Sequence, residues 1–188
     1  MAIKVKAIIG STSSTSFNLK LVTFMKNRYA EQLDITPVFV NDLEMFSIDI
    51  ENNPSENVMD FKNNVKDSDA VLFAVPEYNF SIPGALKNAI DWLSRGGEFT
   101  LPGKPAFIVG SSMGAFGSIR AQLHLREILS NPTLAPALLQ GNEVYIGSVH
   151  EKINEAGELT DQATIDFLDA VVKNFVEFYN KNNATVHA

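Results

Sequence analysis

The chain has 188 residues, 45% of them hydrophobic, which suits the core of one domain at about 150 residues per domain. Its formal net charge of −7 argues against a nucleic-acid binder, because such a protein needs a basic face to meet phosphates. Cysteine is absent, which excludes disulfides, thiolate catalysis, iron–sulfur clusters and cysteine-ligated zinc.

The N-terminal segment leads directly into a strand pattern, without the long apolar region and cleavage site of a secretory signal. No stretch approaches the roughly 18 apolar residues of a membrane span. The sequence therefore predicts a soluble cytoplasmic protein with neither a membrane nor a nucleic-acid partner.

Short apolar runs alternate with helix-length amphipathic segments along the chain. In order, the pattern predicts strand 3–9, helix 18–32, strand 35–40, helix 55–66, strand 70–75, helix 83–93, strand 105–110, helix 118–129, a fifth strand within 134–146 that is interrupted by Gln140-Gly141-Asn142, and helix 160–180. We see neither an internal repeat nor a linker, so residues 1–188 are expected to form one domain.

This alternation predicts an α/β fold, in which a five-stranded parallel sheet is covered on both faces by helices. Right-handed crossovers leave few topologies, among them the flavodoxin-like three-layer sandwich with strand order 2-1-3-4-5. Such sheets bind ligands at the carboxyl ends of the strands, at the switch point between strands one and three. The loops that follow those two strands have an unusual composition here.

The loop after the first strand is rich in hydroxyl side chains and leads into a helix. Unpaired N–H groups at a helix N-terminus suit a phosphate, and Ser11, Ser13, Ser16 and Asn18 would add donors around it. Alternatively, the loop is simply flexible and Ser16 or Asn18 only caps the helix. Neither the GxxxxGK[ST] pattern nor GxGxxG is present, so a P-loop and a standard dinucleotide site are disfavoured.

The loops after the third and fourth strands could hold a flat ring. Pro76 and Tyr78 offer apolar faces, while Glu77 and Asn79 could tether the loop or contact a ring edge. Glu77 could instead be a solvated surface carboxylate. The glycines of the fourth-strand loop permit close backbone approach to a ligand, or they simply make a tight turn.

Three motifs occur in order, and the second is the most specific because a long pattern seldom arises by chance. They are Gly10-Ser11-x-x-x-x-Ser16-Phe17-Asn18, Pro76-Glu77-Tyr78-Asn79-x-Ser81-x-Pro83-Gly84-x-Leu86-Lys87-Asn88-Ala89-Ile90-Asp91-Trp92, and Ser111-Ser112-Met113-Gly114. Through them, nearly the whole chain resembles the NADPH-dependent FMN reductase family, which includes quinone, azo-dye and chromate reductases.

The resemblance implies noncovalently bound FMN, with NADPH or NADH as the co-substrate. It implies that the FMN phosphate is held by Ser11, Ser16, Phe17 and Asn18. It also implies that the flavin ring is lined by Pro76, Glu77, Tyr78 and Asn79 and closed on its other side by Ser111, Ser112, Met113 and Gly114. Many members carry Arg where this chain has Ser13, and Gly-Gly where it has Gly117-Ser118. These departures predict weaker FMN retention and an altered nicotinamide entrance.

The implied reaction is a ping-pong cycle on the flavin. The nicotinamide reduces FMN and leaves, and a quinone, free flavin, azo compound or similar acceptor takes its place. The chemistry lies on the flavin, so no side chain is assigned as catalytic. No metal site is expected either, because His124 falls in a helix while His150 and His187 are expected to be exposed.

Helix 118–129 is apolar on two sides, which is typical of a helix buried against both the sheet and a partner. One side carries Ala121, Leu125, Ile128 and Leu129, and the other carries Ile119 and Leu123. The alternative is one broad core face. The resemblance implies a homodimer or homotetramer with the flavin near the subunit boundary.

Two other functions stay open at this point. One is a flavodoxin-type electron carrier without reductase activity of its own, for which the acidic charge would suit partner steering. The other is a structural or regulatory protein that kept the fold and lost FMN.

Overall fold

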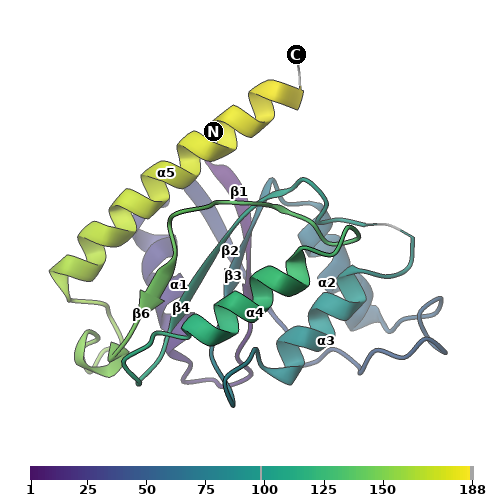
Figure 1. Ribbon diagram of the computed structural model, residues 1–188, viewed down its shortest axis with the longest axis horizontal. Coiled ribbons are helices and arrows are strands. Elements are labelled where there is room, and N and C mark those ends of the chain that lie inside the picture. The colour runs from purple at the N-terminus through teal and green to yellow at the C-terminus, as the bar shows by residue number, and fades with distance from the viewer. Residues whose placement is uncertain (98, 187–188) are drawn as a thin grey trace.

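The computed structural model describes residues 1–97 and 99–186 and has three layers, with a parallel sheet between two layers of helices (Figure 1). Its longer strands are β1 (Ile3–Ile9), β2 (Leu33–Phe39), β3 (Ala70–Ala74) and β4 (Pro105–Ser111), with β2 at one edge. The strand order β2-β1-β3-β4-β5 confirms the predicted flavodoxin-like topology.

The predicted fifth strand consists of two short pieces that both pair in parallel with β4. Strand β5 (Ala137–Leu138) lies beside the start of β4, and β6 (Val144–Ile146) lies beside its end. The interruption predicted at residues 140–142 separates the two pieces, and Gly141 there has a φ of 70°. A residue without Cβ adopts this left-handed conformation freely.

The helices divide between the two faces of the sheet (Figure 1). Helices α1 (Phe17–Arg28) and α5 (Gln162–Val186) pack into one hydrophobic cluster with the inward side chains of β1 and β4. Helices α2 (Glu56–Lys66), α3 (Gly84–Leu93) and α4 (Ile119–Leu129) pack into a second cluster on the opposite face. Strands β3 and β4 are buried throughout, as expected for parallel strands covered on both sides.

The structure shortens one predicted helix and lengthens another. Helix α1 ends at Arg28, four residues before the predicted end, and Tyr29 serves as its C-cap. The chain then turns so that the Gln32 carbonyl accepts a hydrogen bond from the Ile3 N–H at 2.9 Å, which starts the pairing with β1. Residues 29–32 thus form the turn that leads into β2, whereas periodicity alone assigned them to the helix. Helix α5 runs six residues beyond the predicted end at residue 180.

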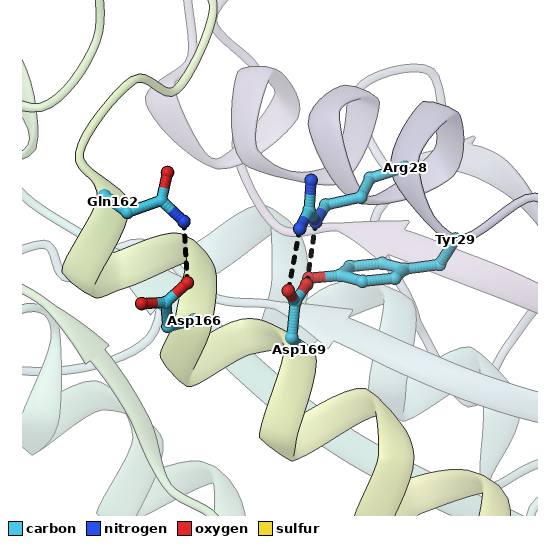
Figure 2. Close-up of polar contacts among 5 residues, drawn as sticks. All are labelled: Arg28, Tyr29, Gln162, Asp166 and Asp169. Atoms are coloured by element: carbon cyan, nitrogen blue, oxygen red, sulfur yellow. Dashed lines mark hydrogen bonds and ion pairs between the residues drawn. The ribbon is translucent and has the colours of Figure 1, made fainter.

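Helices α1 and α5 are joined at their surface by a polar cluster (Figure 2). Arg28 donates two hydrogen bonds of 2.7 Å to the Asp169 carboxylate, and the Tyr29 hydroxyl donates another of 2.8 Å. The Arg28 guanidinium, with a smaller contribution from Tyr29, holds the pKa of Asp169 below its ordinary value. Burial, together with the nearby carboxylate, raises the pKa of Tyr29. This cluster adds a polar contact between α1 and α5 beside the hydrophobic packing that holds α5 on the sheet.

Within the described residues, no helix is long and apolar enough to cross a membrane. Across the same ranges, no three His, Asp or Glu side chains gather as they would around a metal ion. His124 lies on α4 and His150 is exposed in the short 3₁₀ helix η1 (Val149–Glu151), both as predicted. His187 lies outside the described residues.

Candidate functional site

Three loops gather at one edge of the sheet, because the strands that precede them end at the same level. Ile9 of β1 is in register with Ala74 of β3, and Ala74 is in register with Val109 of β4. The loops that follow these strands carry the residues predicted for the site, except Phe17 and Asn18, which begin α1, and Ser111, which ends β4. They therefore lie together at the carboxyl ends of parallel strands, where open α/β sheets bind ligands.

The first loop begins at Gly10, which is hydrogen-bonded to the end of β3. The Gly10 N–H donates to the Ala74 carbonyl at 2.9 Å, and a Cβ at this position would lie 2.9 Å from the Leu86 side chain. Side chains farther along the loop hold its shape. Ser11 is buried and its hydroxyl accepts a hydrogen bond from the Ser13 N–H at 3.2 Å. Only glycine at position 10 allows this loop to lie so close to β3 and α3.

Ser16 is the N-cap of α1, as one alternative in the sequence predicted. Its hydroxyl accepts a hydrogen bond from the Leu19 N–H at 3.3 Å, and the side chain is buried. A serine cap satisfies one of the N–H groups that every helix N-terminus leaves unpaired. Phe17 follows the cap, and Lys20 places its ammonium 5.2 Å from the centroid of that ring. Lys20 thus brings a positive charge to a loop that otherwise has none.

Asn18 joins the first loop to the end of β4. Its side chain amide donates to the Ser111 carbonyl at 3.2 Å, and its side-chain oxygen accepts from the Ser111 N–H at 2.9 Å. Both residues are 3% exposed. The amide that the sequence suggested as a ligand donor is thus engaged in holding two loops together across 93 residues of sequence.

Glu77 tethers the third-strand loop to α4. One of its carboxylate oxygens accepts hydrogen bonds from the N–H groups of Arg120 and Ala121, at 3.1 and 3.3 Å. These are N–H groups of the first turn of α4, so the carboxylate caps that helix and meets the positive end of its dipole. Its side chain is 15% exposed, which identifies the tether rather than the solvated carboxylate among the alternatives.

Beyond Glu77 the loop forms a two-residue turn at the surface. Tyr78 and Ser81 exchange backbone hydrogen bonds of 2.9 and 3.0 Å across it. Asn79 and Phe80 between them have φ values of 50° and 65°, as in a type I′ turn. Asn tolerates the left-handed region, whereas a bulky aromatic residue there is strained. Phe80, which the sequence reasoning missed, is 66% exposed at this position.

The fourth-strand loop is held against β6. The Ser112 N–H donates to the Ile146 carbonyl at 3.0 Å, and the Gly114 carbonyl accepts from the Ser148 N–H at 3.1 Å. The Ser112 hydroxyl donates to the same Gly114 carbonyl at 2.9 Å, so its side chain stabilises the turn itself. Met113, at the tip of the turn, is 61% exposed. The loop therefore presents its tip to solvent from a fixed base.

Gly110 is required because the Ser118 side chain and the Val75 carbonyl leave no room for a Cβ. A Cβ on Gly110 would overlap the Ser118 hydroxyl and lie 2.7 Å from the Val75 carbonyl. Ser118, which replaces glycine in the family pattern, has a φ of 66° and accepts a hydrogen bond of 3.2 Å from the Gln122 amide.

The buried Ser111 hydroxyl has no hydrogen-bond partner among the described residues.

A pocket of about 470 Å³ lies between the third- and fourth-strand loops. Its walls include Glu77, Asn79, Phe80, Ser112, Gly114 and Phe116. Phe116 is 65% exposed and was also missed by the sequence reasoning. The pocket has the size and the mixed apolar and polar lining that are usual for a small-molecule site.

The second half of the long motif has a structural role. Asn88 accepts a hydrogen bond from the Phe46 N–H at 2.7 Å and donates to the Glu44 carbonyl at 2.9 Å. The indole N–H of Trp92 donates to the same carbonyl at 2.8 Å, and its ring meets Phe46 edge-on at 5.1 Å. These side chains, one turn apart on α3, hold the segment that connects β2 to α2.

Known proteins resemble the chain over almost its whole length. A model of the NADPH-dependent FMN reductase family matches residues 3–151. An NADH-dependent flavin reductase subunit 2 from Lactobacillus johnsonii is 39% identical over 179 residues, which are 93% of this chain and 96% of the relative. A quinone reductase from Escherichia coli is 32% identical over 184 residues, covering 95% and 96% of the two chains.

The fold comparison agrees with the sequence comparison. The structure of a flavoenzyme NAD(P)H:(acceptor) oxidoreductase from Paracoccus denitrificans superposes with a TM-score of 0.87 at 33% identity, covering 96% of this chain and 99% of the other. The three converging loops, the pocket between the third- and fourth-strand loops and these likenesses lead to one conclusion. The chain belongs to the NADPH-dependent FMN reductase family and is an oxidoreductase.

Proposed function

We propose that the chain binds FMN noncovalently and passes electrons from NADPH or NADH to a quinone, free flavin, azo compound or similar acceptor in a ping-pong cycle. The observation that carries this proposal is the reciprocal pair of hydrogen bonds between Asn18 and Ser111. It joins the hydroxyl-rich loop at the start of α1 to the fourth-strand loop that walls the pocket. A phosphate and a flat ring on one ligand need those two features side by side.

The donor groups of the first loop suit the phosphate of FMN. The hydroxyls of Ser11 and Ser16 each accept a hydrogen bond from a backbone N–H, so each keeps its own hydrogen to donate. The Ser13 hydroxyl likewise accepts from the Thr15 N–H. With the N-terminus of α1 behind them, these hydroxyls would make a hydrogen-bonding anion site without the arginine that many family members carry, so weaker FMN retention remains the expectation. Phe17 and Lys20 complete the proposed phosphate end.

The remaining residues would hold the ring. In the proposal, the third-strand loop contributes Pro76, Glu77, Tyr78 and Asn79, and the fourth-strand loop contributes Ser111, Ser112, Met113 and Gly114. When bound, FMN supplies the hydride chemistry, so the protein must bind, orient and tune it. Glu77 contributes by fixing its loop on α4, and the exposed mouth of the pocket leaves room for donor and acceptor to bind in turn.

The proposal includes a homodimer or homotetramer in the cytoplasm. Ala121, Leu125 and Leu129 of α4 are buried against the sheet, whereas Leu123 on the other side is 53% exposed. The second apolar side predicted for this helix is therefore available to a second copy of the chain. Light scattering coupled to size exclusion tests this part, and a monomer at micromolar concentration would contradict it.

Anaerobic addition of NADPH or NADH to the purified protein tests the reductase function. The expected result is a flavin absorbance band that bleaches without any partner protein and returns on adding a quinone. A yellow protein that neither nicotinamide bleaches would be an electron carrier instead. A colourless protein that leaves the fluorescence of added FMN unquenched would have lost the cofactor. Rates with both nicotinamides and several acceptors then establish the preferred substrates.

A further inference from the structure

Arg120 lies at the mouth of the pocket between two exposed aromatic rings. The carbon of its guanidinium is 4.4 Å from the centroid of Phe80 and 5.5 Å from that of Phe116. Both phenylalanines line the pocket. The third- and fourth-strand loops, which flank the pocket, thus each offer one ring to the same cation.

Arg120 also lies close to the Glu77 carboxylate. One of its guanidinium nitrogens lies 3.7 Å from a Glu77 carboxylate oxygen, while the other carboxylate oxygen caps α4. This separation exceeds that of a close charge-assisted hydrogen bond. The side chain of Arg120 remains 47% exposed. A positive charge therefore lies beside two rings that line the pocket, with about half of its side chain open to solvent.

Core packing does not account for this arrangement. Phe80 and Phe116 leave about two thirds of their surface in water, at 66% and 65% exposure. Phe80 also adopts a backbone conformation that is costly for an aromatic residue. Such strain persists mainly at functional sites, where the surrounding structure maintains it. Two exposed rings that hold a cation beside a pocket are suited to a ligand with a flat ring and a negative charge.

We propose that Arg120, flanked by Phe80 and Phe116, forms the subsite for an anionic group on the molecule that exchanges electrons at the pocket. The inference rests on the proposed reductase function and specifies how its substrates are selected. A guanidinium presents a planar set of donors that matches a phosphate or carboxylate in two-point contact, and it stacks on aromatic faces. The anionic group is either the diphosphate of the reduced nicotinamide dinucleotide or an acid group on an aromatic acceptor.

The test compares wild type with R120Q and R120K, and uses K26Q as the matched control. R120Q removes the charge but leaves the cap on α4, because Glu77 accepts from backbone N–H groups that any residue supplies. K26Q removes one positive charge from an exposed position near the C-terminal end of α1, far along the helix from the site loop. Thermal unfolding establishes that each variant is folded.

Charged and neutral substrates distinguish the two sources of the anion. If the diphosphate is bound, R120Q raises the KM for NADH about tenfold, the effect expected from losing one charge-assisted hydrogen bond, and leaves that for uncharged N-benzyl-dihydronicotinamide unchanged. If an acceptor acid is bound, the same rise occurs for anthraquinone-2-sulfonate and not for 1,4-benzoquinone. R120K keeps the charge but not the planar donor set, so its KM falls between those of wild type and R120Q in either case, and K26Q changes neither KM.

Equal changes for charged and neutral substrates, or no change for any of them, would overturn the proposal. Calorimetric titration of the purified protein with NAD⁺ and with anthraquinone-2-sulfonate gives a reading that does not depend on turnover. If R120Q weakens neither ligand, the subsite is absent. Wild-type protein that no donor reduces would contradict the reductase function, while these titrations would still decide the role of Arg120.

Discussion

Replacement of Asn18 by Ala should destabilise the protein far more than its place near the start of a surface helix suggests. The substitution removes two hydrogen bonds to Ser111 and leaves a backbone N–H and a carbonyl in a region where both residues are 3% exposed. A buried polar group without its partner costs about 1–3 kcal/mol. The better helix propensity of Ala returns about 0.5 kcal/mol. We expect the free energy of unfolding to fall by about 2–3 kcal/mol.

Urea unfolding of the FMN-free protein measures this loss without any contribution from the ligand. The control is N27A, which replaces the same residue type at an exposed position of the same helix. N27A should remain within about 0.5 kcal/mol of wild type, as is usual for surface substitutions. FMN titration by fluorescence quenching should show weaker binding for N18A alone. If N18A is as stable as N27A, the two loops are not joined as described and the argument for a single site fails.

Three further substitutions probe the supports of the site and of the fold. D169N should lower the stability at pH 7 by at most about 1 kcal/mol, because the ion pair in Figure 2 is exposed. A carboxyl whose folded pKa is depressed stabilises only while ionised, so urea unfolding at decreasing pH should show this difference shrink below pH 3.8 and vanish once the folded carboxyl is protonated. G110A should cost about 2–3 kcal/mol, since its Cβ would overlap the Ser118 hydroxyl, and an unchanged melting temperature would contradict this. W92F should cost about 2–3 kcal/mol in urea, because it removes the donor to the Glu44 carbonyl and leaves a cavity at a fully buried side chain; no loss would mean that the indole does not hold that segment.

The parts of the fold that were predictable are those governed by local pattern. The buried runs at β1, β3 and β4 contrast sharply with the polar loops that follow them, and their boundaries fall within a residue of prediction. The end of α1 was mispredicted, because apolar spacing continued past Arg28, whereas residues 29–32 form a turn that brings the Gln32 carbonyl to the Ile3 N–H at the start of β1. Local preference gave way to a tertiary contact that a single sequence does not display.

The site was predictable as a set of loops but not as a set of contacts. Asn18 and Glu77 could be singled out by residue type, yet their partners lie 93 and about 43 residues away. Phe80 and Phe116 escaped notice because aromatic residues usually belong to a core, and nothing in the sequence indicated their exposure. The pair Asn79-Phe80 also lacks the glycine that is typical of the second central position of a type I′ turn. The available signal was that both rings fall inside loops that already carried candidate residues.

The buried base of the site and its exposed mouth differ in how much substitution they tolerate. This difference affects which electron acceptors the site can take. Beneath the fourth-strand loop, Gly110, Ser111 and Ser118 are buried and admit little change without steric overlap or an unpaired polar group. At the mouth, Phe80, Phe116 and Arg120 contact mainly one another and solvent. Substitution there costs little stability, because neither ring is packed in the core and Phe80 holds an unfavourable backbone angle. Under the proposed function, acceptor preference can therefore change through residues of the mouth, while the buried base that is proposed to hold the cofactor stays unchanged.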